Sequence, residues 1–118
     1  ENLIFIKEFT KKNKLKYFHI FQPNIFSKKN KFDYEHKLIN NLWLTPNGIG
    51  DAFKIAESSY DEIKSKLEMA NINSTNFSNI FNNLNEKIYL DYSHVNTLGN
   101  KIIAEEINKL LKTKKLIN

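Results

Sequence analysis

Residues 88–100, Ile88-Tyr-Leu-Asp-Tyr-Ser-His-Val-Asn-Thr-Leu-Gly-Asn100, decide how this chain is interpreted. A short apolar run ends at Asp91, His94 follows three residues later, and a pattern typical of an amphipathic helix begins at about Thr97. This order predicts an extended segment, a tight turn and a helix. The turn would hold a carboxylate and an imidazole on the same side of a rigid scaffold.

An acid and a histidine held together in this way are the parts of an oriented general base. A hydroxyl nucleophile is weak at neutral pH and needs a base, and a carboxylate on the second ring nitrogen fixes the tautomer of that base. His94 is therefore a candidate catalytic base and Asp91 its partner; the alternative is an N-terminal turn with a solvated or hydrogen-bonded histidine. The same spacing recurs at Asp33 and His36, which we interpret as structural. We interpret His19 as a strand residue with satisfied hydrogen bonds.

Hydrophobic periodicity predicts further elements along the chain. The run at residues 17–21 is aromatic and β-branched, and Pro23 ends it, so we expect a buried strand that is parallel and central. Asp33 is expected to cap the helix that follows it. The predicted helices cover residues 1–14, 33–43, 49–70 and 97–112, with short strands at 17–21 and about 73–77 and an apolar run at 87–90.

Helices that alternate with short apolar strands favour an α/β layered domain. The chain has 118 residues, which is enough for one domain, yet the predicted strands are few for so many helices. The chain begins at Glu1 within a predicted helix and without an initiator methionine. We therefore expect residues 1–118 to be the carboxy-terminal part of a single domain whose other strands lie upstream.

Composition excludes several classes of function. There is no cysteine, which rules out disulfides and thiolate chemistry within the chain. The net charge of +5 comes from 18 lysines and no arginine, spread among acidic residues and asparagines, so we do not expect a nucleic-acid partner. No apolar run approaches the roughly 18 residues of a membrane span. We predict no metal site and no cofactor.

The context of the Asp–His pair resembles a known family. Residues 89–107 are similar to the last sequence block of the SGNH (GDSL-type) hydrolases, in which an Asp-x-x-His pair precedes Val/Leu-Asn, a glycine and a helix with an Ile-Ala pair. Residues 18–24, Phe-His-Ile-Phe-Gln-Pro-Asn, resemble the penultimate strand of that family and the turn after it. The matching residues of the last block are Asp91, His94, Val95, Asn96, Gly99, Ile103 and Ala104.

The resemblance implies a three-layer α/β/α, flavodoxin-like fold with a parallel sheet, of which this chain holds the carboxy-terminal portion. It also implies serine ester hydrolase chemistry of the esterase or lipase type, on a small-molecule, carbohydrate or lipid ester. Asp91 and His94 would supply two members of a Ser-His-Asp triad. Gly99 would let the last helix pack closely on the sheet.

The nucleophilic serine and the oxyanion-hole residues of that family lie in earlier blocks that have no match here. None of the seven serines sits in such a block. We therefore expect the parent protein to be the enzyme, the 118-residue chain alone to be inactive, and the missing amino-terminal part to be its partner. The alternative is a non-catalytic interaction domain or remnant that keeps the fold without a nucleophile.

Two further residues are candidates for substrate binding. Ligands of open parallel sheets bind beyond the carboxyl ends of the strands. Gln22 and Asn24 follow the strand at 17–21 and would share that edge with the Asp91–His94 turn. The alternative is that both side chains only satisfy backbone groups in a turn.

Overall fold

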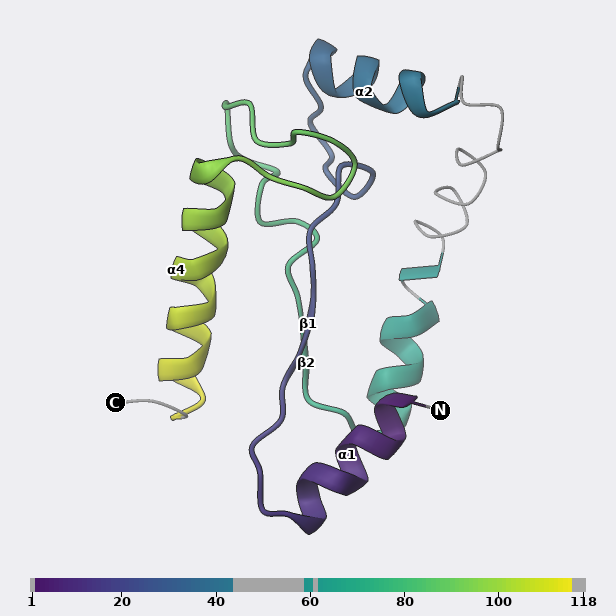
Figure 1. Ribbon diagram of the computed structural model, residues 1–118, viewed down its shortest axis with the longest axis vertical. Coiled ribbons are helices and arrows are strands. Elements are labelled where there is room, and N and C mark those ends of the chain that lie inside the picture. Colours follow the sequence, from purple (N-terminus) through teal and green to yellow (C-terminus); the bar gives the residue numbers. More distant parts are fainter. Residues whose placement is uncertain (1, 44–58, 61, 116–118) are drawn as a thin grey trace.

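Two short parallel strands lie at the centre of the molecule (Figure 1). The computed structural model describes residues 2–43, 59–60 and 62–115. Its elements, in chain order, are α1 (Asn2–Lys12), β1 (His19–Phe21), α2 (Asp33–Trp43), β2 (Ser74–Asn76) and α4 (Thr97–Thr113), and residues 62–69 are also helical. The chain is thus a mixed helix-and-strand structure with a small parallel sheet, as the α/β class predicts.

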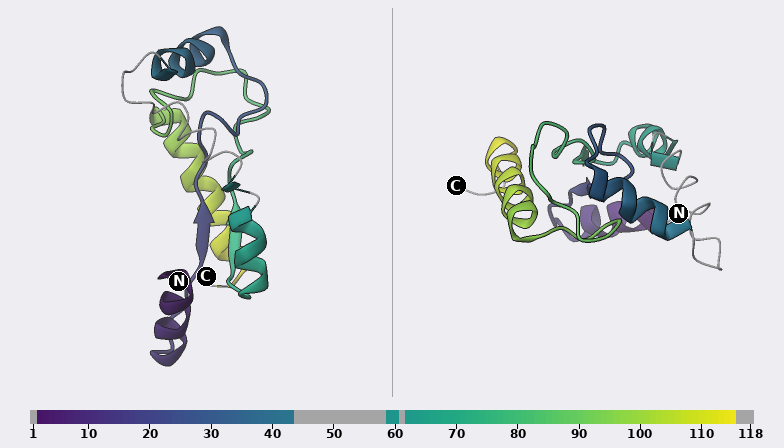
Figure 2. Two further views of the ribbon diagram at one scale, coloured as in Figure 1. Left: turned by 90° about the vertical axis from the view of Figure 1, so that its right-hand side faces the viewer. Right: turned by 90° about the horizontal axis from the view of Figure 1, so that it is seen from above.

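The helices surround the strand pair on two sides and at both ends. α4 lies on one side of the strands and residues 62–69 on the other, which both Figure 1 and the view from above in Figure 2 show. α1 and α2 lie at opposite ends of the long axis, and α4 begins at the end occupied by α2. The extents of 47 × 31 × 18 Å make the molecule a thin slab.

The sheet brings two segments far apart in sequence into register. β1 and β2 pair in parallel, with His19 opposite Ser74 and Phe21 opposite Asn76. The N–H of Phe77 donates to the carbonyl of Phe21 at 2.9 Å, so the two strands end together. Each strand is shorter than predicted. The apolar run at 87–90 forms no ladder. Instead, Tyr89 makes an isolated antiparallel bridge to Val95, which lies beyond the turn.

The predicted helices are found where the structure describes the chain, with one correction. Asp33 is the first helical residue of α2 and not its cap. The N–H of the residue before it, Phe32, donates to the Glu35 carboxylate at 2.9 Å. Asn96 caps α4, and its side-chain oxygen accepts from the N–H of Gly99 at 2.9 Å. Residues 49–58 and 61 of the helix predicted at 49–70 lie outside the described residues.

Two hydrophobic clusters hold these elements together. One consists of Phe21, Leu67 and Ile72 and lies near α1 and residues 62–69. The other lies under the Asp91–His94 turn and joins the loop after β1, α2, residues 88–89 and α4. Its buried members are Ile25, Phe81, Ile88 and Tyr89, with Leu38, Ile39, Val95, Ile102 and Ile103 packed against them. The turn therefore rests on the second cluster.

Gly99 fits where α4 meets the residues before it. A Cβ at this position would lie 2.7 Å from Val95 Cβ and 2.8 Å from Ile88 Cγ2. We expect Gly99→Ala to lower the free energy of unfolding by about 1–2 kcal/mol, because overpacking outweighs the gain of roughly 1 kcal/mol in helix propensity. Urea unfolding of the chain measures this, with exposed Asn108→Ala in the same helix as the control. A Gly99→Ala chain more stable than wild type would contradict the close packing.

Candidate active site

The turn at residues 91–94 is organised around the Asp91 carboxylate. Asp91 Oδ1 accepts from the backbone N–H groups of Ser93 at 2.9 Å and His94 at 2.8 Å. Asp91 Oδ2 lies 2.7 Å from His94 Nδ1. One short side chain therefore both closes the turn and holds the imidazole, which is the arrangement expected from the Asp-x-x-His spacing.

Backbone hydrogen bonds close the loop below this turn. The N–H of Leu90 donates to the carbonyl of His94 at 2.9 Å, and the N–H of Asn96 donates to the carbonyl of Ile88 at 2.8 Å. The N–H of Ile25 donates to the Tyr92 carbonyl at 2.9 Å, which ties the loop after β1 to the turn. The Asp–His pair thus sits on a closed hairpin that continues directly into α4.

The Asp91 carboxylate defines which tautomer the neutral imidazole of His94 adopts. The N–H groups of His94 and then Ser93 stabilise the carboxylate, and the His94 ring adds to this, so the pKa of Asp91 falls to about 2. An ionised carboxylate only accepts hydrogen bonds, which places the hydrogen of a neutral ring on Nδ1. Nε2 is then the basic nitrogen, and no group in the described part of the chain hydrogen-bonds to it. The His94 side chain is 76% exposed, so Nε2 is reachable.

His94 and Gln22 line the same cavity of about 430 Å³ at the carboxyl end of β1. Its polar wall also includes Ser93 and Asn100, and its other lining residues are Ile20, Pro23, Phe77, Val95, Ile103 and Ile107. The sheet thus brings Gln22 and His94 to one edge, as predicted. A larger concavity of about 800 Å³ lies between α1 and residues 62–72, but Lys66 is the one ionisable side chain among the described residues that line it, so the chemistry favours the smaller site.

Asn24 is placed differently from Gln22. Its side-chain oxygen accepts from the N–H groups of Phe26 at 2.9 Å and Ser27 at 3.0 Å, and it is not among the residues that line the cavity. The alternative interpretation, in which the side chain satisfies backbone groups of a turn, therefore holds for the amide oxygen of Asn24. Asn100 was not singled out from the sequence, although its helical spacing of three and seven residues from Ile103 and Ile107 places it on the cavity face of α4.

The second Asp-x-x-His pair has a different geometry. Asp33 and His36 are both exposed on the first turn of α2, and no hydrogen bond or ion pair joins their side chains in the described part of the chain. His19 lies on β1 with its Nδ1 3.4 Å from the Tyr17 hydroxyl. The Asp-x-x-His spacing alone is therefore not sufficient to bring the acid and the imidazole together as in Asp91 and His94.

No cluster of three or more histidine, aspartate or glutamate side chains in the described ranges could hold a metal ion. None of the helices in those ranges combines the length and apolar character needed to cross a bilayer. Comparisons with protein-family models, curated proteins and solved structures returned no match to this chain.

The depressed pKa of Asp91 predicts how acid affects the turn. Because the folded value of about 2 lies below the ordinary 3.8, the stabilisation is present above about pH 4 and is lost as the pH falls toward 2. A ¹³C NMR titration of the Asp91 carboxyl carbon should show a midpoint near 2. Asp91→Asn should remove this part of the acid dependence of unfolding. A midpoint at the ordinary value would mean that the turn does not hold the carboxylate in solution.

Proposed function

We propose that this chain is the carboxy-terminal part of an SGNH-type serine ester hydrolase domain with a three-layer α/β/α fold. The observation that carries the proposal is the 2.7 Å contact between Asp91 Oδ2 and His94 Nδ1, on a turn that borders a cavity. Its sequence context resembles the last block of that family. His94 is the general base, Asp91 orients it, and Gln22 is placed to contact the substrate.

The chemistry follows from the orientation of the imidazole. A serine hydroxyl from the amino-terminal part attacks the ester carbonyl while His94 Nε2 takes its proton, and Asp91 stabilises the imidazolium. The tetrahedral intermediate then collapses: the bond between the carbonyl carbon and the alcohol oxygen breaks, the imidazolium protonates the leaving alcohol, and the acyl–enzyme remains. Water enters by the reverse sequence, with His94 again as the base, and releases the acid. The oxyanion hole, worth about 3–4 kcal/mol per donor, belongs to the amino-terminal part as well.

Three features support an incomplete domain. The sheet of the described residues has two strands, which is small for a three-layer fold. α1 has no buried residue and exposes Ile4, Phe5 and Phe9, with Phe5 68% exposed. The radius of gyration is 16.3 Å, whereas a compact domain of this length has about 13–14 Å. A further layer of sheet and helix would cover these surfaces.

The complete coding sequence that contains residues 1–118 tests the proposal. We expect a Gly-Asp-Ser-like block after an apolar strand upstream of Glu1, and a fluorophosphonate probe should label that serine in the complete protein. The 118-residue chain alone should not be labelled. An intact gene without a nucleophile in the protein or in a partner would refute the hydrolase and favour a non-catalytic interaction domain.

A further inference from the structure

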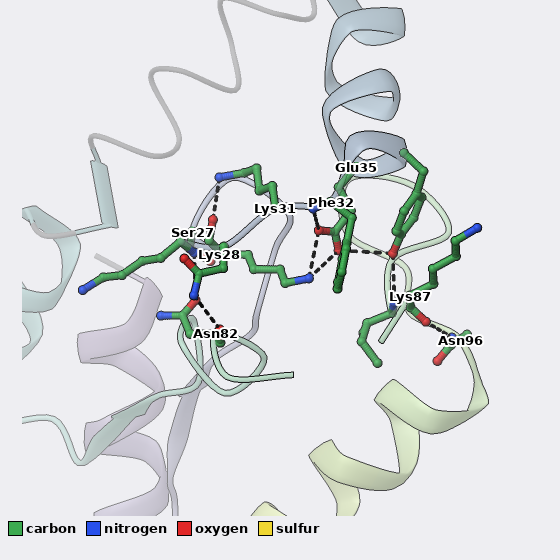
Figure 3. A network of polar contacts seen from close by, with 12 residues as sticks. Ser27, Lys28, Lys31, Phe32, Glu35, Asn82, Lys87 and Asn96 are labelled. Carbon is green, nitrogen blue, oxygen red and sulfur yellow. Dashed lines mark hydrogen bonds and ion pairs between the residues drawn. The ribbon is translucent and has the colours of Figure 1, made fainter. Parts of the chain in front are cut away.

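A fully buried ion pair lies close to the loop that carries the Asp–His turn. Lys28 Nζ lies 2.8 Å from both carboxylate oxygens of Glu35, and both side chains are 0% exposed (Figure 3). Two further donors reach the same carboxylate: the N–H of Phe32 at 2.9 Å and the hydroxyl of Tyr34 at 3.2 Å. The Glu35 carboxylate is therefore fully engaged and fixed in one orientation.

Tyr34 links the Glu35 carboxylate to residues 88–96, the loop that carries the Asp91–His94 turn. Its hydroxyl oxygen accepts from the backbone N–H of Ile88 at 2.9 Å. Burial, followed by the charge of Glu35, raises the pKa of Tyr34, so the hydroxyl stays protonated. Because Glu35 is an acceptor only, the hydroxyl proton points to Glu35 and the oxygen lone pairs remain for the N–H of Ile88.

Ile88 is the residue at which the loop closes. Its N–H is held by Tyr34, and its carbonyl accepts from the N–H of Asn96, which caps α4. Asp91 and His94 lie between these two closing residues. The contact from Tyr34 thus fixes the base of the hairpin against α2, while the Ile25–Tyr92 hydrogen bond fixes its tip against the loop after β1.

We propose that Tyr34 is a positioning residue for the Asp91–His94 pair, and that Lys28 and Glu35 act through it by fixing its hydroxyl. This inference rests on the proposed function for its catalytic meaning. Without the Tyr34 hydroxyl, the N–H of buried Ile88 would lose its hydrogen-bond partner, and the loop would be free to move relative to Gln22 and the cavity. The expected result is a loop that still forms but no longer holds His94 in one place.

Nuclear magnetic resonance of the complete protein tests the proposal. In Tyr34→Phe, amide exchange at Leu90 and Asn96 should accelerate by about tenfold or more, while the Phe77 amide on β1 keeps its protection. The downfield Nδ1–H signal of His94 should broaden or disappear. The matched control is Tyr17→Phe, whose hydroxyl contacts His19, and it should leave these signals unchanged.

Unchanged Leu90 and Asn96 exchange and an unchanged His94 signal in folded Tyr34→Phe would overturn the proposal. If Tyr34→Phe does not fold, exchange in the wild-type chain under mild denaturant decides instead. The amides of Ile88, Leu90 and Asn96 should then lose protection together, and earlier loss at Ile88 alone would overturn the positioning role. None of these measurements needs an ester substrate. If Tyr34→Phe changes amide exchange and the His94 signal as expected but the complete protein hydrolyses no ester, the proposed function is wrong and the positioning role of Tyr34 stands.

Discussion

If the complete protein is the proposed ester hydrolase, His94→Ala is expected to lower its kcat/KM for a short-chain aryl ester by about 10⁴-fold or more, because the serine would lose its base. Asp91→Ala should cost one or two orders of magnitude less, since Nε2 can still accept a proton when the ring is poorly oriented. The measurement is steady-state hydrolysis with each variant at equal folded concentration. Equal activity of wild type and His94→Ala would refute the assignment of the base.

The chain provides its own matched control for this experiment. His36 has the same Asp-x-x-His spacing but is exposed on α2, and no hydrogen bond or ion pair joins its side chain to that of Asp33 in the described part of the chain. His36→Ala should therefore leave kcat/KM unchanged. A loss in His36→Ala as large as that in His94→Ala would show that the assay reports general destabilisation and not the chemistry of the 91–94 turn.

The Asp91–His94 pair could be predicted because everything that makes it is local. The carboxylate, the two N–H groups that it accepts from and the imidazole lie within four consecutive residues. Asn24 could not be assigned in the same way. Its short side chain accepts hydrogen bonds from nearby backbone N–H groups, as asparagine often does in turns, whereas Gln22, two residues earlier, lines the cavity.

The buried Lys28–Glu35 pair could not be predicted from sequence. Lys28, Lys29 and Lys31 occupy one polar loop, where lysine is normally solvated. Only the packing of α2 against that loop separates them: Lys28 is fully buried against Glu35, Lys29 is exposed, and Lys31 Nζ donates to the carbonyl of Phe26 at 3.0 Å. Such a difference arises from tertiary contacts that no local pattern contains.

Breaking the buried pair is expected to have the largest effect on stability. Removal of one partner from a buried ion pair leaves an uncompensated charge and costs about 3–5 kcal/mol. Glu35→Leu should cost the upper part of this range, because it leaves the Lys28 ammonium with the Phe32 ring, 4.5 Å from its centroid. Lys28→Met should cost less, since the N–H of Phe32 and the hydroxyl of Tyr34 still reach the Glu35 carboxylate.

The double variant separates the charge from the network around it. Lys28→Met with Glu35→Leu removes both charges and should recover part of the loss, but the donors of Phe32 and Tyr34 then lack their acceptor, so recovery stays incomplete. Urea unfolding of all four chains gives the coupling energy. Lys109→Met, which breaks the exposed Lys109–Glu106 pair, is the control and should change stability by about 0–1 kcal/mol. A Glu35→Leu effect no larger than that control would mean that the pair is solvated, and Tyr34 would then lack the fixed acceptor that orients it toward Ile88.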